Sequence, residues 1–137
     1  MGAFIFLCDA TTERECLNRQ LFGTNFGESH RLYFSGVAIG DTLFLYNLDT
    51  GTLRGPYFAK TVCTMNLEKE AWRATKRKFP WQVRVDSSRC HKNPLSADEL
   101  RAIVPLTSSP AGLMPPAILN ENQLAGMIIA LENKDRS

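Results

Sequence analysis

The apolar residues of this chain gather in short runs, and this limits the folds that the chain can adopt. The first run, Ala3 to Cys8 (AFIFLC), is continuous and contains two aromatic residues, so it favours a buried strand over a helix. A second run, Thr42 to Asn47 (TLFLYN), also reads as a strand. No run approaches the ~20 apolar residues that a membrane-spanning helix needs. We therefore expect a fold built on strands in an aqueous compartment, with no membrane partner.

Turn chemistry follows the second run and predicts an antiparallel neighbour. Leu48 to Gly51 ends in a glycine that can take a positive φ, which suits a hairpin. The returning strand, Thr52 to Thr64, is interrupted at Gly55-Pro56, where a bend or bulge is expected. Gln82 to Asp86 (QVRVD) alternates with period two. This strand should point its valines inward and leave Arg84 exposed or paired.

Helices are predicted where a capping residue is followed three positions later by Glu or Gln. The pairs are Thr12 with Glu15, Ser96 with Glu99, and Asn120 with Gln123. For the first helix, Asp9 or Thr11 is an equally good cap. Pro105 to Pro116 separates the last two helices and is expected to be an irregular connection.

The 137 residues suit one domain, residues 1–137, and 44% hydrophobic with 22% charged residues is an ordinary globular composition. Together the elements predict an α+β fold, with a curved, mostly antiparallel sheet approaching a barrel and short helices at its edges. The start at Met1 suggests a small stand-alone protein, although an excised domain is the open alternative.

Cysteine and histidine usage argues against a metal site and against a disulfide framework. The four cysteines include no Cys-x-x-Cys pair, and His30 and His91 are badly spaced for zinc. A core of this size needs no disulfides, so reduced thiols and a cytoplasmic location are the simpler interpretation. No cofactor is indicated.

Positive charge is concentrated between Lys69 and Lys92, which holds half of the 16 lysines and arginines against only Glu70 and Asp86. Local patches of this kind attract anionic partners, although a solvated loop is an equally good interpretation. The candidate nucleic-acid-binding residues are Arg73, Lys76, Arg77, Lys78 and Arg84.

Aromatic residues beside this segment could stack on a base. Trp72 is the better candidate of the two tryptophans to face a ligand, although a core position is the open alternative for it. Trp81 shares the parity of the inward valines and should point to the core. Tyr33 and Phe34, in a glycine-rich loop, are candidates for the opposite wall, or they plug the core. Asn47 could read a base edge, or it could equally be a strand-end residue.

Catalysis is not expected. Cys90 and His91 are sequence neighbours whose side chains diverge on a strand end, so they cannot easily pair as nucleophile and base. No glycine-rich loop is followed by the Lys-Ser/Thr of a phosphate-binding loop.

Several motifs in order resemble the DCD (development and cell death) domain. They begin with Gly2 to Cys8 and Glu13 to Gly23, the latter closing in Leu-Phe-Gly, and continue through Leu43 to Asn47. The resemblance resumes at Phe79 to Val85 (FPWQVRV) and extends to Pro94-Leu95. It is carried by several motifs at once. The last thirty or so residues match only as a closing helix.

The resemblance implies a PUA-like fold related to YTH and EVE domains, which bind RNA or modified bases in aromatic pockets. DCD domains have no established reaction, so the implied function is a non-catalytic module that binds single-stranded RNA or a modified nucleotide. The alternative is a protein-protein interaction or dimerisation module, whose anchors would be the exposed aromatics Tyr33, Phe34, Tyr57 and Phe58.

Overall fold

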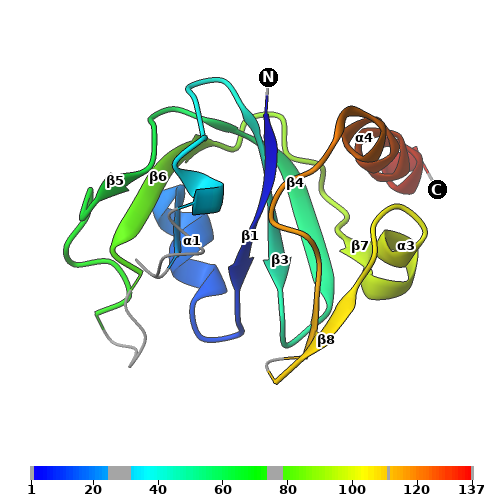
Figure 1. Ribbon diagram of the computed structural model, residues 1–137, viewed down its shortest axis with the longest axis horizontal. Coiled ribbons are helices and arrows are strands. Elements are labelled where there is room, and N and C mark those ends of the chain that lie inside the picture. The colour runs from blue at the N-terminus through cyan, green and yellow to red at the C-terminus, as the bar shows by residue number, and fades with distance from the viewer. Residues whose placement is uncertain (1, 25–31, 74–78, 111, 137) are drawn as a thin grey trace.

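A curved sheet of seven strands forms the centre of the molecule (Figure 1). The structure, a computed structural model, describes residues 2–24, 32–73, 79–110 and 112–136. The strands of the sheet are β1 (Ala3–Cys8), β2 (Leu21–Thr24), β3 (Thr42–Asn47), β4 (Thr52–Ala59), β5 (Thr64–Met65), β6 (Trp81–Asp86) and β7 (Leu95–Ser96). The helices that flank the sheet include α1 (Glu13–Arg19), α3 (Ala97–Arg101) and α4 (Glu121–Arg136).

The strand order is β1-β3-β4-β6-β2, with β5 added to β6 and β7 added to β4. Among the described strands of this sheet, β1 and β3 pair in parallel and the other pairs are antiparallel. The predicted α+β class and mostly antiparallel sheet are therefore confirmed. No backbone pairing joins β1 to β2 within the described ranges, so the sheet is not closed and the expected barrel is not confirmed.

The sheet is buried on both faces, which explains why β1 is apolar without alternation. Phe4 and Phe6 face a core shared with α1, whereas Ala3 and Ile5 face a second core. The second core includes Met127 and Leu131 of α4, as their helical spacing predicts. Figure 1 shows α1 on one side of β1 and β3, with α3 and α4 on the other.

All three helices start where they were predicted, and two of the three capping pairs form reciprocal hydrogen bonds. Ser96 and Glu99 form a complete capping box, and Asn120 accepts a hydrogen bond from the backbone N–H of Gln123. The Thr12-Glu15 pair does not form a capping box. Thr12 occupies the N-cap position of α1 but makes no side-chain cap hydrogen bond, and the Asp9 carboxylate accepts hydrogen bonds from the N–H groups of Thr11 and Thr12 in the turn before the helix.

The expected irregular connection at 105–116 contains a small hairpin, so that expectation is wrong. Strands β8 (Thr107–Ser109) and β9 (Gly112–Met114) pair in antiparallel fashion. The prolines that argued against regular structure lie before β8, in the turn and after β9, where no ladder N–H is required. Within the described part of the chain, no helix is long and apolar enough to cross a membrane.

Candidate binding pocket

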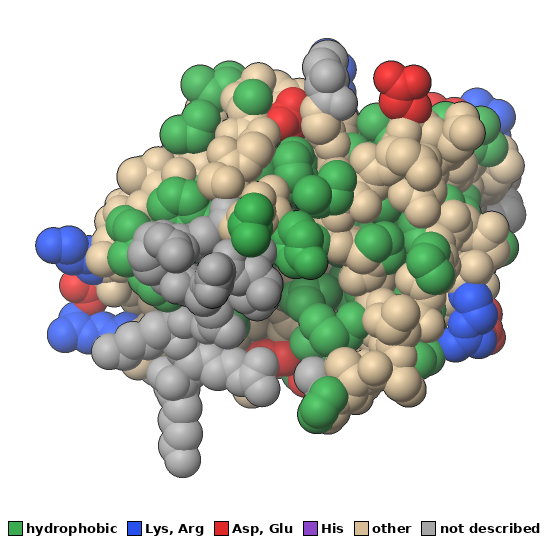
Figure 2. All heavy atoms as spheres, viewed as in Figure 1, with side chains coloured by type: hydrophobic (Ala, Val, Ile, Leu, Met, Phe, Trp, Pro, Cys, Tyr) green, Lys and Arg blue, Asp and Glu red, His purple; other side chains and the backbone are tan. Residues whose placement is uncertain are grey.

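A cavity of about 620 Å³ lies where the sheet fails to close, between β1 and β2. One side is lined by Ile5, Leu7 and Cys8 of β1, and the other includes Gly23 and Thr24 at the end of β2. This volume falls in the range of about 300–1,000 Å³ that is typical of small-molecule pockets. Figure 2 shows a hollow in this face, with hydrophobic side chains gathered around it.

Aromatic residues form part of the pocket lining. Phe34 is buried and its ring stacks on Phe6, with centroids 4.2 Å apart, whereas Tyr33 is 46% exposed and lies at the mouth. The structure thus brings together the two residues that the sequence suggested as one wall. Phe79, which sequence reasoning missed, completes this side. Its position directly after the basic residues 76–78 was the available signal.

A second wall comes from the end of β9, at Met114, and from the segment after it, which includes Ile118. This segment lies along the free edge of β1, because the N–H of Ile5 donates to the carbonyl of Ala117 at 2.9 Å. The N–H of Leu119 makes the matching bond to the carbonyl of Ala3. Sequence reasoning missed this wall, because it treated the whole segment as a connection.

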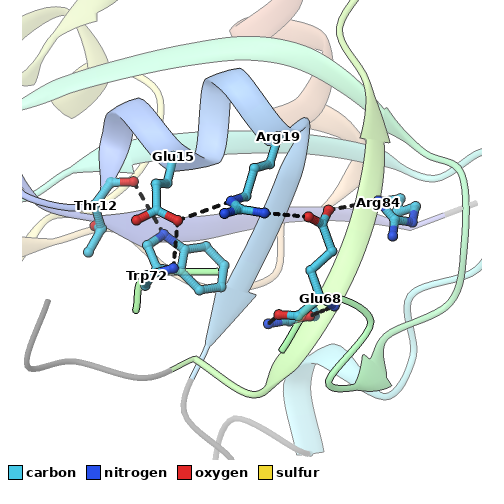
Figure 3. A network of polar contacts seen from close by, with 7 residues as sticks. Thr12, Glu15, Arg19, Glu68, Trp72 and Arg84 are labelled. Atoms are coloured by element: carbon cyan, nitrogen blue, oxygen red, sulfur yellow. Dashed lines mark hydrogen bonds and ion pairs between the residues drawn. The ribbon is translucent and has the colours of Figure 1, made fainter. Parts of the chain in front are cut away.

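Trp72 does not line the pocket, so the structure supports the core position and not the ligand-facing one. Its side chain is only 1% exposed, and its indole Nε1 donates to the carbonyl of Thr12 at 3.3 Å. Its backbone N–H donates to the Glu15 carboxylate at 2.6 Å (Figure 3). The indole packs edge-on against Phe79, with ring centroids 5.3 Å apart. Trp72 is therefore a core residue that packs against Phe79, a residue of the pocket wall.

The same carboxylate, Glu15, begins a chain of charged contacts away from Trp72. Arg19 donates to Glu15 and to Glu68, and Arg84 also donates to Glu68 at 2.8 Å (Figure 3). Burial alone would raise the pKa of Glu68, but the hydrogen bonds from the two arginines outweigh it and hold that pKa below its ordinary value. Arg84 is thus paired, and the network links α1 to β6.

Arg73, the other described candidate for nucleic-acid contact, does not line the pocket. Arg73 pairs with Glu70 on the surface, and the candidates Lys76, Arg77 and Lys78 lie outside the described residues. The lysine and arginine side chains visible in Figure 2 stand at the margin of that face.

Asn47 is occupied within the fold. Its Oδ1 accepts hydrogen bonds from the N–H groups of Asp49 and Thr50, and its Nδ2 donates to Glu13 at 3.2 Å. The side chain is buried, and it does not line the pocket. Of the two interpretations left open by the sequence, the structure supports the strand-end residue.

The four cysteines are free, and Cys8 lies in the pocket wall. Burial raises the pKa of Cys8, and it raises the pKa of Cys16 and of Cys63 to about 12, so these thiols stay protonated at neutral pH. Among the described residues, no group of three or more His, Cys, Asp or Glu side chains is placed to hold a metal ion.

The arrangement of strands and helices matches solved structures along nearly the whole chain. The YTH domain of the Zygosaccharomyces rouxii MRB1 protein, solved in complex with N6-methyladenosine RNA, aligns with a TM-score of 0.62 at 9% identity, over 95% of this chain and 86% of that one. A protein of Agrobacterium tumefaciens aligns with a TM-score of 0.61 at 13% identity, over 95% and 93%. The chain therefore shares its fold with these structures, among them a YTH domain, as expected.

The chain belongs to the development and cell death domain family, whose sequence profile matches residues 2–108. It is 35% identical to the B2 protein of Daucus carota over 108 residues, and 35% identical to the DCD domain-containing protein NRP-B of Glycine max over the same length. These alignments cover 76% of this chain, 51% of the carrot protein and 32% of the soybean protein. The chain thus spans about half or less of the relatives that it matches.

Proposed function

We propose that this domain binds a nucleobase of single-stranded RNA, plain or modified, in the pocket between β1 and β2, without catalysing a reaction. The observation that carries the proposal is an aromatic-lined cavity of about 620 Å³ at the gap in the sheet. Phe34, Tyr33 and Phe79 line it from one side, and a flat base gains about 1–3 kcal/mol by stacking on such a ring.

Charge supports one orientation of the ligand. Asp9 is among the lining residues, and a negative charge at the pocket disfavours phosphate there, so we expect the base to enter and the sugar-phosphate backbone to stay outside. Residues 76–78, Lys-Arg-Lys, directly precede Phe79 in the sequence, and they are our candidates for phosphate contacts. The solved YTH domain was crystallised with N6-methyladenosine RNA, which makes a methylated adenine a natural probe.

Fluorescence anisotropy with labelled single-stranded RNA, with and without N6-methyladenosine, tests the proposal at two ionic strengths. Tyr33→Ala should weaken binding by about 1–3 kcal/mol through loss of a stacking surface. Ile39→Ala is the control, because Ile39 is 71% exposed and does not line the pocket. Equal binding by both variants, or no binding of the unsubstituted protein at low salt, would refute the proposal.

The phosphate contacts are tested by a separate variant. Replacing Lys76, Arg77 and Lys78 by glutamine should flatten the dependence of log Kd on log salt concentration, because fewer counterions are released. A variant with Lys92, Arg101 and Arg136 replaced by glutamine removes the same charge elsewhere and should keep the steep dependence.

The four free cysteines favour a reducing compartment, and on this ground we propose that the domain is cytoplasmic.

A protein-interaction function is the second candidate. Phe34 and Tyr57 are buried and cannot serve as exposed anchors, but Leu32 and Tyr33 are exposed neighbours, and Tyr33 also lines the pocket. Sedimentation velocity across concentration would reveal self-association, and a monomer throughout would count against dimerisation.

A further inference from the structure

The end of β2 brings a glycine to the pocket. Gly23 lines the cavity and has no side chain, so only its main chain can meet a ligand there. The direction of its N–H and C=O groups then decides whether Gly23 can form hydrogen bonds with a ligand in the pocket. The hydrogen-bond ladder between β2 and β6 fixes that direction.

In an antiparallel pair, residues alternate between those that bond to the neighbouring strand and those that point away from it. Gln20 bonds to β6, because its carbonyl accepts from the N–H of Val85 at 3.0 Å. The register places Phe22 opposite Val83 and Gly23 opposite Gln82. Phe22 is therefore the next residue to bond to β6, and the N–H and C=O of Gly23 turn to the other edge.

The pairing on the far side of β6 agrees with this assignment. The carbonyl of Pro80 accepts from Asn66, beside β5, at 2.7 Å, and Thr64 of β5 lies opposite Gln82. Pro80 and Gln82 have the same parity, so the main chain of Gln82 points toward β5 and away from Gly23. The donor and acceptor of Gly23 thus face the gap between β1 and β2.

A peptide strand cannot fill this gap by pairing with both edges. Two strands with one strand between them lie about 9–10 Å apart. Cα atoms of β1 and β2 approach within 8 Å. A flat ring that enters only at the Leu7 and Gly23 end needs less room, and the gap is open there.

We propose that the main-chain N–H and C=O of Gly23 read the Watson–Crick edge of the bound base, which carries a hydrogen-bond donor beside an acceptor. This inference rests on the proposed function. The Watson–Crick edge is the part of a base far from the ribose, so it reaches deepest when the backbone stays outside. The main chain of an extended residue offers one donor and one acceptor on the same side, which matches that edge.

The test uses the full chain labelled with 15N and the four common ribonucleosides. The nucleoside that binds most tightly is compared with an analogue whose Watson–Crick donor is blocked: N6,N6-dimethyladenosine, N4,N4-dimethylcytidine, 3-methyluridine or 1-methylguanosine. The analogue should bind about threefold to tenfold more weakly, as expected for a lost hydrogen bond. The parent nucleoside should shift the Gly23 amide resonance, and the analogue should not.

A 2′-O-methyl nucleoside keeps the base edge and should behave like the parent, which controls for bulk. If the parent and the blocked analogue bind with equal affinity and neither shifts the Gly23 amide resonance, the proposal that Gly23 contacts the base edge is refuted. The proposal that the pocket binds a base would still hold. If no nucleoside shifts any pocket resonance and RNA also fails to bind, the proposed function fails first, and this inference fails with it.

Discussion

The indole of Trp72 occupies the space that a side chain on residue 23 would need. A Cβ atom added to Gly23 would lie 2.6 Å from Cη2 of Trp72, closer than such atoms can approach. Phe79 crowds the same point, with its own Cβ at 2.8 Å. Residue 23 must therefore be glycine for Trp72 to be buried in this position.

Gly23→Ala should destabilise the domain by about 1–3 kcal/mol, because the added methyl group overpacks a filled site. Gly36→Ala is the matched control, since its Cβ would meet only ordinary contacts at 3.8 Å and beyond. Urea denaturation at neutral pH measures both. Adding Trp72→Phe to Gly23→Ala should recover part of the loss, and equal stability of the two single variants would contradict the packing described.

Replacing Trp72 by alanine and replacing Tyr33 by alanine should have different effects on stability and on RNA binding. Trp72→Ala is expected to cost about 3–5 kcal/mol of stability, as for other large buried aromatics. Tyr33→Ala should stay within about 0.5 kcal/mol of the unsubstituted protein, because the side chain is half exposed, while it weakens RNA binding. Thermal and urea unfolding with RNA titration would show this. The reverse pattern would restore Trp72 as the ligand-facing residue.

Glu68→Gln should cost about 1–2 kcal/mol, because Arg19 and Arg84 lose their shared carboxylate. The pKa of Glu68 is lowered in the folded state, so its contribution is complete above the ordinary value of 4.5. The contribution disappears as the pH falls through the lower folded-state pKa. The difference between Glu68→Gln and the unsubstituted protein should therefore shrink in acid.

Glu70→Gln is the control for that experiment, because the Glu70–Arg73 pair is exposed on both sides and contributes little. Unfolding at a series of pH values from 7 down to the acid limit of the fold measures both variants. A Glu68→Gln difference that is independent of pH would show that its ion pairs do not stabilise the fold.

The cysteines should react with iodoacetamide in an order set by burial. Cys16 and Cys63, whose pKa values are raised to about 12 by burial, should stay unmodified in the folded protein at pH 8. Cys90 is only partly buried and should react first. Mass spectrometry of timed samples distinguishes the sites, and denaturant should make all four reactive. Early modification of Cys16 would contradict the core packing.

Local patterns predicted the strands and most helix starts because their causes lie within a few residues. Ala3–Cys8 and Thr42–Asn47 are β1 and β3, and Val83 and Val85 point inward, as period two requires. The bulge at Gly55-Pro56 appears as a register shift between β3 and β4. Turn and capping chemistry are equally local, which is why Ser96 could be assigned.

Trp72 could not be assigned in this way, because its partners lie far away in the sequence. Glu15 is 57 residues away and takes the Trp72 backbone N–H, although its spacing from Thr12 indicated a capping box. The pocket wall at Met114 to Ile118 depends likewise on pairing with β1, at the opposite end of the chain. Single-sequence periodicity carries no record of such contacts.

The two sides of the pocket come from different parts of the chain. The family profile ends at residue 108, so it includes β1 and β2 but stops before Met114. The family profile therefore contains the strands that position the Gly23 main chain but not the opposite wall at Met114 to Ile118. Under the function that we propose, one side of the pocket comes from the part of the chain that defines the family, and the other side comes from outside it.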